Sequence, residues 1–154
     1  MTTTPIKAMI LDMDGVLWRA DAPIGNLPEI FQEIAAKGIQ VAYATNNSTR
    51  TVDQYVKRLA NFGISAEAWQ VTTSALATAR YLKGHFPEGG PVYLVGQDGI
   101  EKALLENGFT IQEKDVIAVV AGMDNYLTYQ KLRTATLLLR AGVPFIGTNP
   151  DRTF

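Results

Sequence analysis

The stretch AMILDMDGVL, residues 8–17, begins as an apolar run and ends in two carboxylates and a glycine. The run at 8–11 predicts a short buried β-strand. Asp12 and Asp14 follow at its carboxyl end, where open α/β sheets bind ligands. If both carboxylates face one cavity, they can hold a hard cation through oxygen, and one can act as nucleophile while the other moves protons. The alternative is an Asx turn that only ends the strand.

A second apolar run, residues 39–44, leads into Thr45, Asn46, Asn47 and Ser48. A hydroxyl, an amide and the N–H groups of a turn together suit an anion such as phosphate. The alternative is a helix N-cap, and capping and phosphate binding can coexist.

The two segments together resemble motifs one and two of the haloacid dehalogenase superfamily of phosphatases. The details are most similar to its type IIA branch, the 4-nitrophenylphosphatase and N-acetylglucosamine-phosphatase-like proteins. The resemblance runs from Ile6 to the last residue. The matching stretches are residues 12–17, 44–48, 92–96, 119–124 with 128–129, and 148–151.

The resemblance implies a magnesium-dependent phosphomonoester hydrolase that works through an aspartyl phosphate. Asp12 is the expected nucleophile and Asp14 the expected acid, then base. Mg²⁺ is expected on the Asp12 carboxylate and, by resemblance, on the Asp14 backbone carbonyl. A small-molecule phosphoester is the expected substrate, and its phosphoryl oxygens would meet the hydroxyl and N–H groups of motif two. The candidate substrate-binding residues are Gly15, Thr45, Asn46 and Asn47, and of these Asn47 is in second rank together with Ser48.

Strand and helix patterns alternate along the whole chain, which predicts an α/β fold with parallel strands and right-handed crossovers. By resemblance, residues 1–84 are the N-terminal part of a Rossmann-like core domain, and residues 85–154 are the first part of a type IIA α/β cap. The Gly/Pro-rich connector at 84–91 marks the boundary. The expected strands are residues 8–11, 39–44, 69–72, 92–95, 116–121 and 143–147.

Helix-start patterns also occur along the chain. Asn26 with Glu29 predicts a capping box, and Ser74 predicts the N-cap of a later helix. Trp18 and Trp69 are expected to be packing residues rather than stacking platforms.

Composition narrows the function classes. Hydrophobic residues make up 47% of the 154 residues and charged residues 19%, which is enough for a core. A net charge of −1 gives no electrostatic reason to expect nucleic-acid or membrane partners. The absence of cysteine removes thiol catalysis, disulfides and zinc–thiolate sites. No apolar run is long enough to span a bilayer, and residues 1–5 lack signal-peptide features, so we expect a cytoplasmic protein.

The single histidine, His85, lies in the connector and is expected to be an ordinary surface residue. A Ser-His-Asp triad would depend on it. The remaining catalytic candidates are carboxylates, hydroxyls and amines, which fits aspartate-based phosphoryl transfer.

In the family, the chain continues well beyond Asp151 to a lysine motif and a late acidic motif. By resemblance, the lysine screens charge and the acidic residues complete the magnesium shell. Neither motif has a counterpart before Phe154. We therefore expect a fragment with little or no phosphatase activity alone. The strand at 8–11 should then be a sheet edge, so we expect the chain to be unstable, or to pair as a homodimer, by strand exchange or with a partner chain.

Other functions remain open from the residues. A non-catalytic phosphate- or metal-binding or interaction module is the main alternative for this chain. A signalling receiver domain would need its phosphoacceptor after a later strand, and a nucleotide-sugar transferase using Asp-x-Asp would need a second feature that the chain lacks. Three further positions are weaker substrate-contact candidates, for which turn chemistry is the alternative: Asp124, Asn149 and Asp151.

Overall fold

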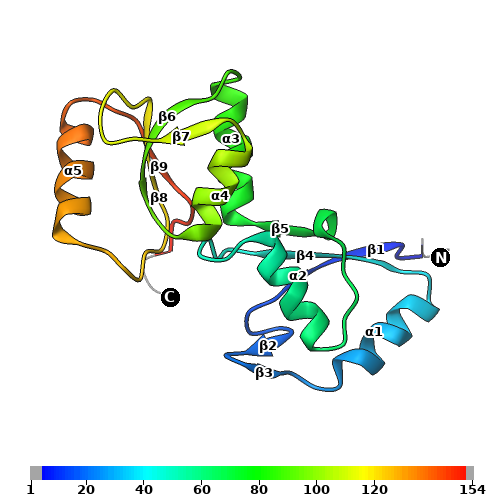
Figure 1. The fold of residues 1–154 in the computed structure, drawn as a ribbon. Helices are drawn as coiled ribbons and strands as arrows, with labels where there is room; N and C mark the ends of the chain where they lie inside the picture. The colour runs from blue at the N-terminus through cyan, green and yellow to red at the C-terminus, as the bar shows by residue number, and fades with distance from the viewer. Residues whose placement is uncertain (1–4, 152–154) are drawn as a thin grey trace. The chain divides into compact units, whose positions relative to one another are not determined.

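The computed structural model describes residues 5–151, which form two compact units joined by the chain (Figure 1). The first unit comprises residues 5–45 and 52–72, and the second comprises residues 46–51 and 73–151. The chain therefore passes between the units three times, after Thr45, Thr51 and Thr72. Parallel strands and alternating helices in both units confirm the predicted α/β fold.

The first unit contains a three-stranded sheet in the order β1-β4-β5, in which β1 and β4 are parallel. Its strands are β1 (Ala8–Asp12), β4 (Gln40–Thr45) and β5 (Val71–Thr73). Its other elements are the hairpin β2 (Trp18–Arg19) and β3 (Ala22–Pro23), the helices α1 (Leu27–Ala36) and α2 (Val52–Asn61), and a 3-10 turn at Ala68–Gln70.

Only one face of this sheet carries the core of the first unit. Tyr43 and Val71 project from the strands and pack with Leu27 of α1 and with Tyr55 and Leu59 of α2. The prediction that residues 8–11 form an edge strand is confirmed, because among residues 5–151 β1 pairs only with β4 and lies at the end of the sheet order.

The prediction that β1 is buried is wrong. Its residues alternate between exposed and half-buried, and Ile10 is 75% exposed. One face of the strand contacts the core of the first unit, whereas the opposite face has no layer of the described chain over it.

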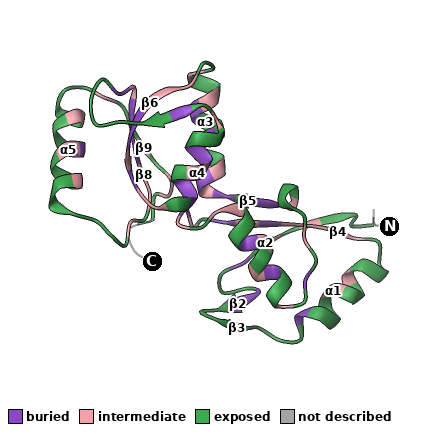
Figure 2. Ribbon diagram, in the orientation of Figure 1, coloured by how far each residue is buried: buried purple, intermediate pink, exposed green. Residues whose placement is uncertain are grey.

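The second unit contains a parallel sheet in the order β7-β6-β8-β9, and helices cover both of its faces. Helices α3 and α4 pack on one face, and α5 packs on the other (Figure 1). Buried residues concentrate on the two central strands, β6 and β8 (Figure 2). The elements are α3 (Ser74–His85), β6 (Gly90–Val95), α4 (Asp98–Glu106), β7 (Phe109–Ile111), β8 (Ala118–Ala121), α5 (Tyr129–Arg140) and β9 (Phe145–Gly147).

Two helix starts differ from the predicted caps. Asn26 precedes α1, but its side chain donates to Glu29 Oε2 at 2.9 Å instead of capping a backbone N–H. Thr73, not Ser74, caps α3, and its hydroxyl accepts from Leu76 N at 3.1 Å. Ser74 is thereby the first helical residue, and its hydroxyl is available for a different bond.

The predicted core–cap boundary at residues 84 and 85 lies within the second unit, at the end of α3, and stays a prediction. His85 is exposed, as expected for an ordinary surface residue. None of the helices in the described part of the chain is long and apolar enough to cross a membrane.

Candidate active site

The two candidate carboxylates lie at the carboxyl end of β1. Asp12 is the last residue of the strand, is exposed, and stands in register with Ala44 of β4. Asp14 follows in the turn, where Thr45 Oγ1 donates to its Oδ2 at 3.3 Å. Parallel pairing of β1 with β4 thus brings motif one beside the end of motif two's strand, and Asp14 beside Thr45.

A tight turn after β1 fixes the position of Asp14. Met13 and Trp18 are fully buried and anchor the turn, and Leu17 N donates to Met13 O at 2.9 Å. The indole Nε1 of Trp18 donates to Asp14 Oδ1 at 2.7 Å. Each oxygen of the Asp14 carboxylate therefore accepts one hydrogen bond, so its orientation is set before any ligand arrives.

Trp18 is the site residue that sequence reasoning missed. It packs as predicted, with Phe62 at 5.6 Å between ring centroids and the Arg58 guanidinium 4.7 Å from its ring centroid. Its second role, as a hydrogen-bond donor to Asp14, depends on the turn geometry. The spacing of four residues between the two is the only sequence signal for it.

Gly15 is explained by its backbone conformation. Its φ of +84° lies in the left-handed region, and its N–H donates to Trp18 O at 2.7 Å. A Cβ there would meet nothing within 4 Å. Glycine is therefore favoured at this position because the turn needs a positive φ, and a role in close approach to substrate stays a prediction.

Asn46 and Asn47 belong to the second unit, in the turn 46–51. Asn46 Nδ2 donates to Asp151 Oδ2 at 3.3 Å. Asn47 Oδ1 accepts from the N–H of Thr49 at 2.8 Å and from its hydroxyl at 2.7 Å, which is an Asx turn. The structure thus groups Asp14 with Thr45 in the first unit and places the two asparagines in the other.

Local bonding favours the turn alternative for the weaker candidates. The Asp124 side chain is only 2% exposed and accepts from Lys131 Nζ at 2.5 Å and from Tyr126 N at 2.8 Å. Asn149 Oδ1 accepts from Asp151 N at 2.9 Å. Each of these side chains has a structural partner that accounts for its presence.

The donor set fits a hard cation only in part. Carboxylate and carbonyl oxygens at Asp12 and Asp14 are the ligand types that Mg²⁺ takes. Residues 5–151 hold no cluster of three or more acidic, histidine or cysteine side chains that would complete a metal shell. A cation at Asp12 would therefore need waters, substrate oxygens or ligands from elsewhere.

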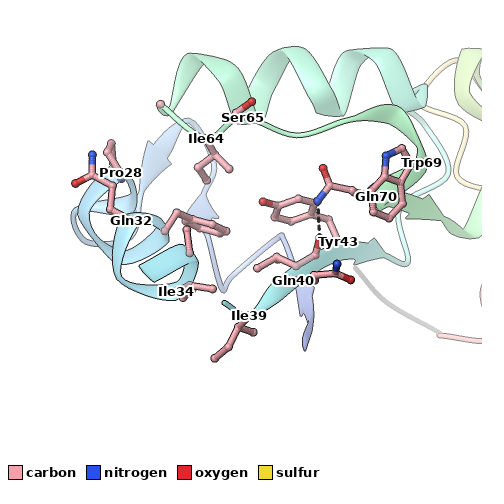
Figure 3. A pocket seen from close by; sticks show the side chains of 14 residues that line it. Pro28, Gln32, Ile34, Ile39, Gln40, Tyr43, Ile64, Ser65, Trp69 and Gln70 are labelled. Atoms are coloured by element: carbon pink, nitrogen blue, oxygen red, sulfur yellow. Dashed lines mark hydrogen bonds between the residues drawn. The ribbon is translucent and has the colours of Figure 1, made fainter. Parts of the chain in front are cut away.

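A cavity of about 440 Å³ lies in the first unit between α1 and the segment 63–70 (Figure 3). It is lined mainly by apolar side chains and contains none of the predicted site residues. Burial raises the pKa of Tyr43 to about 12, so this phenol stays protonated near neutral pH and offers no base. Trp69 also lines the cavity, and at 76% exposed it is not the packing residue that was predicted.

Known proteins resemble this chain in sequence and in fold. A model of haloacid dehalogenase-like hydrolases matches residues 9–110. An acid sugar phosphatase of Staphylococcus aureus is 41% identical over 146 residues, which cover 94% of this chain and 56% of that protein.

Two solved structures extend the agreement to the fold. A 4-nitrophenylphosphatase from Thermotoga maritima matches with a TM-score of 0.88 and 33% identity, over 95% of this chain and 56% of its own. NagD from Escherichia coli K-12 matches with a TM-score of 0.86 and 30% identity, over 98% of this chain and 60% of its own.

The chain belongs to the haloacid dehalogenase-like hydrolase family. Its structural relatives support the type IIA branch within that family. The chain spans a little over half the length of the curated relatives that it matches.

Proposed function

We propose that this chain carries the nucleophile and the acid–base group of a magnesium-dependent phosphomonoester hydrolase that works through an aspartyl phosphate. The observation that carries the proposal is the arrangement around Asp14. Its carboxylate is oriented by Trp18 and Thr45, two residues beyond the exposed Asp12 at the end of β1. Both residues are exposed, but the Asp14 carboxylate accepts two side-chain hydrogen bonds, and carboxylates in different surroundings suit two different roles.

Asp12 would act first. Its carboxylate oxygen attacks phosphorus, the bond to the ester oxygen breaks, and an aspartyl phosphate forms. Asp14, entering this step protonated, gives its proton to the departing ester oxygen. It then takes a proton from the water that attacks the aspartyl phosphate, which releases inorganic phosphate and restores Asp12.

Thr45 is suited to the change in protonation of Asp14. A hydroxyl can donate or accept, whereas the indole N–H of Trp18 can only donate. The Thr45 contact, at 3.3 Å, is thus the one that can reverse when Asp14 carries a proton. Trp18 would hold the Asp14 carboxyl group in place, and the Thr45 hydroxyl would donate to it when Asp14 is ionised and accept from it when Asp14 is protonated.

Magnesium is proposed at Asp12 and Asp14. When bound to the Asp12 carboxylate and the Asp14 main-chain carbonyl, Mg²⁺ would neutralise phosphate charge. Gly15, Thr45, Asn46 and Asn47 are the proposed substrate-binding residues, which act through backbone N–H groups, a hydroxyl and amides. The names of the relatives, an acid sugar phosphatase and a 4-nitrophenylphosphatase, support a small phosphomonoester as substrate.

We further propose a core domain at 1–84, a cap domain from residue 85 and a cytoplasmic location. The exposed edge β1 supports pairing through that strand with a second copy or with further protein chain. These proposals rest on the resemblance and on composition.

Beryllofluoride, which mimics an acyl phosphate, provides the test. With Mg²⁺ present, ¹⁹F NMR of the 154-residue chain should show a bound species that Asp12→Asn abolishes and Asp14→Asn retains. A signal that survives Asp12→Asn would contradict the assignment of the nucleophile. Turnover of 4-nitrophenyl phosphate by this chain should be weak, because residues 5–151 hold no cluster of side chains that completes a metal shell. Preorganised charge around a phosphoryl group commonly contributes orders of magnitude to the rate.

A non-catalytic binding module is the second candidate, favoured by the absence from residues 5–151 of a cluster of three or more side chains that could complete a metal shell. It predicts phosphate binding at the turn 46–51 without any beryllofluoride adduct at Asp12. Strong magnesium-dependent turnover that Asp12→Asn abolishes would instead show that this chain is sufficient for catalysis.

A further inference from the structure

The turn 46–51 is held by residues that lie 28 to 105 positions further along the sequence than their partners in the turn. Ser74 Oγ, at the start of α3, donates to Asn46 O at 2.8 Å. The N–H of Gly99, in the first turn of α4, donates to Thr49 O at 3.1 Å. Proposed phosphate-binding residues are therefore fixed by the framework of the second unit.

Gly99 leaves no room for a side chain against this turn. A Cβ there would lie 2.4 Å from Ser48 O and 2.5 Å from Arg50 O, both main-chain atoms. Gly99 is buried, and its φ is outside the left-handed region. Space, and not backbone conformation, is thus the reason for glycine at this position.

Gly122, after β8, makes a similar approach from a different element. A Cβ there would lie 2.5 Å from Ser48 Oγ and 3.1 Å from Thr148 Oγ1. Ser48 is 2% exposed, and its hydroxyl accepts from Thr148 Oγ1 at 3.4 Å. The obstacle at Gly122 is therefore a side chain, whereas the obstacle at Gly99 is the backbone of the turn itself.

We propose that Gly99 and Gly122 are positioning residues that set the conformation of the turn 46–51, so that the second unit determines where Asn46 and Asn47 present their polar groups. The positioning role of the two glycines is independent of the proposed function, whereas the identity of the ligand rests on it. Phosphate, or the phosphoryl group of an ester, is the ligand that such a turn would bind.

The test uses amide hydrogen exchange, read by NMR on the 154-residue chain. Gly99→Ala and Gly122→Ala should each raise exchange in the turn 46–51 on the order of tenfold or more. An added carbon at residue 99 must displace the backbone of the turn, and one at residue 122 must displace the buried Ser48 side chain. The matched control is Gly84→Ala, where a Cβ would meet nothing within 4 Å, and exchange in the turn should not change.

A second variant separates positioning from general damage. Adding Ser48→Ala to Gly122→Ala removes the hydroxyl at 2.5 Å and leaves the Cβ of residue 48 at an ordinary 3.4 Å. The remaining close atom, Thr148 Oγ1 at 3.1 Å, needs to move by only a few tenths of an ångström, so the turn should regain most of its protection. The same addition should not rescue Gly99→Ala, whose obstacle is main chain. Unchanged exchange in both folded glycine variants, or failure of this rescue, would overturn the inference.

Titration with inorganic phosphate distinguishes this inference from the proposed function. Phosphate affinity should fall about tenfold in the two glycine variants and stay constant in Gly84→Ala. If the unmodified chain binds no phosphate while the variants still loosen the turn, the inference stands and the phosphate-binding role fails. If phosphate binds all variants equally, the positioning role fails and the proposed function stands.

Discussion

The two sheets of this chain are built from similar apolar strands but are covered differently. Residues 8–11 of β1 and residues 118–121 of β8 are both continuous apolar runs. In the second unit, helices pack on both faces and Ala118, Val119 and Val120 are fully buried. In the first unit, helices pack on one face and Ile10 is 75% exposed. An apolar run therefore predicts a strand, but whether that strand is buried depends on the helices that other parts of the chain pack against it.

The largest expected effect comes from the doubly covered sheet. Leu104→Ala should lower the free energy of unfolding of the second unit by about 2–5 kcal/mol, because Leu104 is fully buried and a cavity would remain. Ile10→Ala in the first unit should change stability by no more than about 0.5 kcal/mol. Urea unfolding followed by NMR signals from each unit measures both. Leu105→Ala, 51% exposed in the same helix, is the control. Equal losses at Leu104 and Ile10 would break the comparison.

An intermediate effect is expected at the ion pair of Asp124 with Lys131. Asp124→Asn should cost the second unit about 1–3 kcal/mol, because a nearly buried carboxylate that pairs with Lys131 at 2.5 Å is removed. The surface pair of Lys102 with Glu106 is the matched control, since both side chains are largely exposed. Glu106→Gln should cost no more than about 0.5 kcal/mol. A smaller loss at Asp124 than at Glu106 would show that this pair does not stabilise the unit.

A smaller gain is expected from Gly84→Ala. Gly84 lies in α3 in open space and without a left-handed φ, so alanine should stabilise the helix by about 0.4–1 kcal/mol through a lower entropy of the unfolded chain. Thermal unfolding measures the gain. Gly142→Ala, with a φ of +92°, should destabilise instead, although it also has nothing within 4 Å.

The smallest effect on stability is expected from Ile10→Lys, yet this variant should change association. A lysine on an exposed edge strand opposes pairing with a second edge. Light scattering should show less self-association than in the unmodified chain. Leu105→Lys, an exposed apolar site on a helix, is the control and should leave association unchanged. Identical scattering in all three chains would show that β1 is not a pairing surface.

Much of the site followed from local sequence. The sequence predicted Asp12 and Asp14 at the carboxyl end of one strand and Thr45 at the end of the next, and the structure places Asp12 and Thr45 at the ends of β1 and β4. The contact of Thr45 with Asp14 follows from the parallel pairing of these strands. The order of strands and helices predicted the α/β class in the same way. Both predictions use local patterns, namely apolar strand runs that end in polar turns and the alternation of strand and helix segments. Such patterns depend on residues that are close in the sequence.

Tertiary geometry determined what the sequence did not reveal. The bond from Trp18 to Asp14 depends on the turn at 13–18, and the capping of α3 by Thr73 leaves Ser74 to bind Asn46. The strand β7 was not predicted, because it has only three residues and two of them are exposed. The exposure of Ile10 and Trp69 depends on which parts of the protein cover the first unit. The residues next to them in the sequence do not indicate what those parts are.

The long separation between the turn 46–51 and the residues that hold it has a consequence for synthesis. A ribosome adds about 5–20 residues per second. Thr148 and Asp151, which contact Ser48 and Asn46, therefore emerge about 5–20 seconds after the turn itself, and Gly122 emerges some seconds before them. During that interval the residues of β1 and β4 have already been synthesised, yet the Asn46 amide and the Ser48 hydroxyl lack these two partners. Residues that are translated well after the turn 46–51 therefore complete the contacts of the proposed phosphate-binding residues.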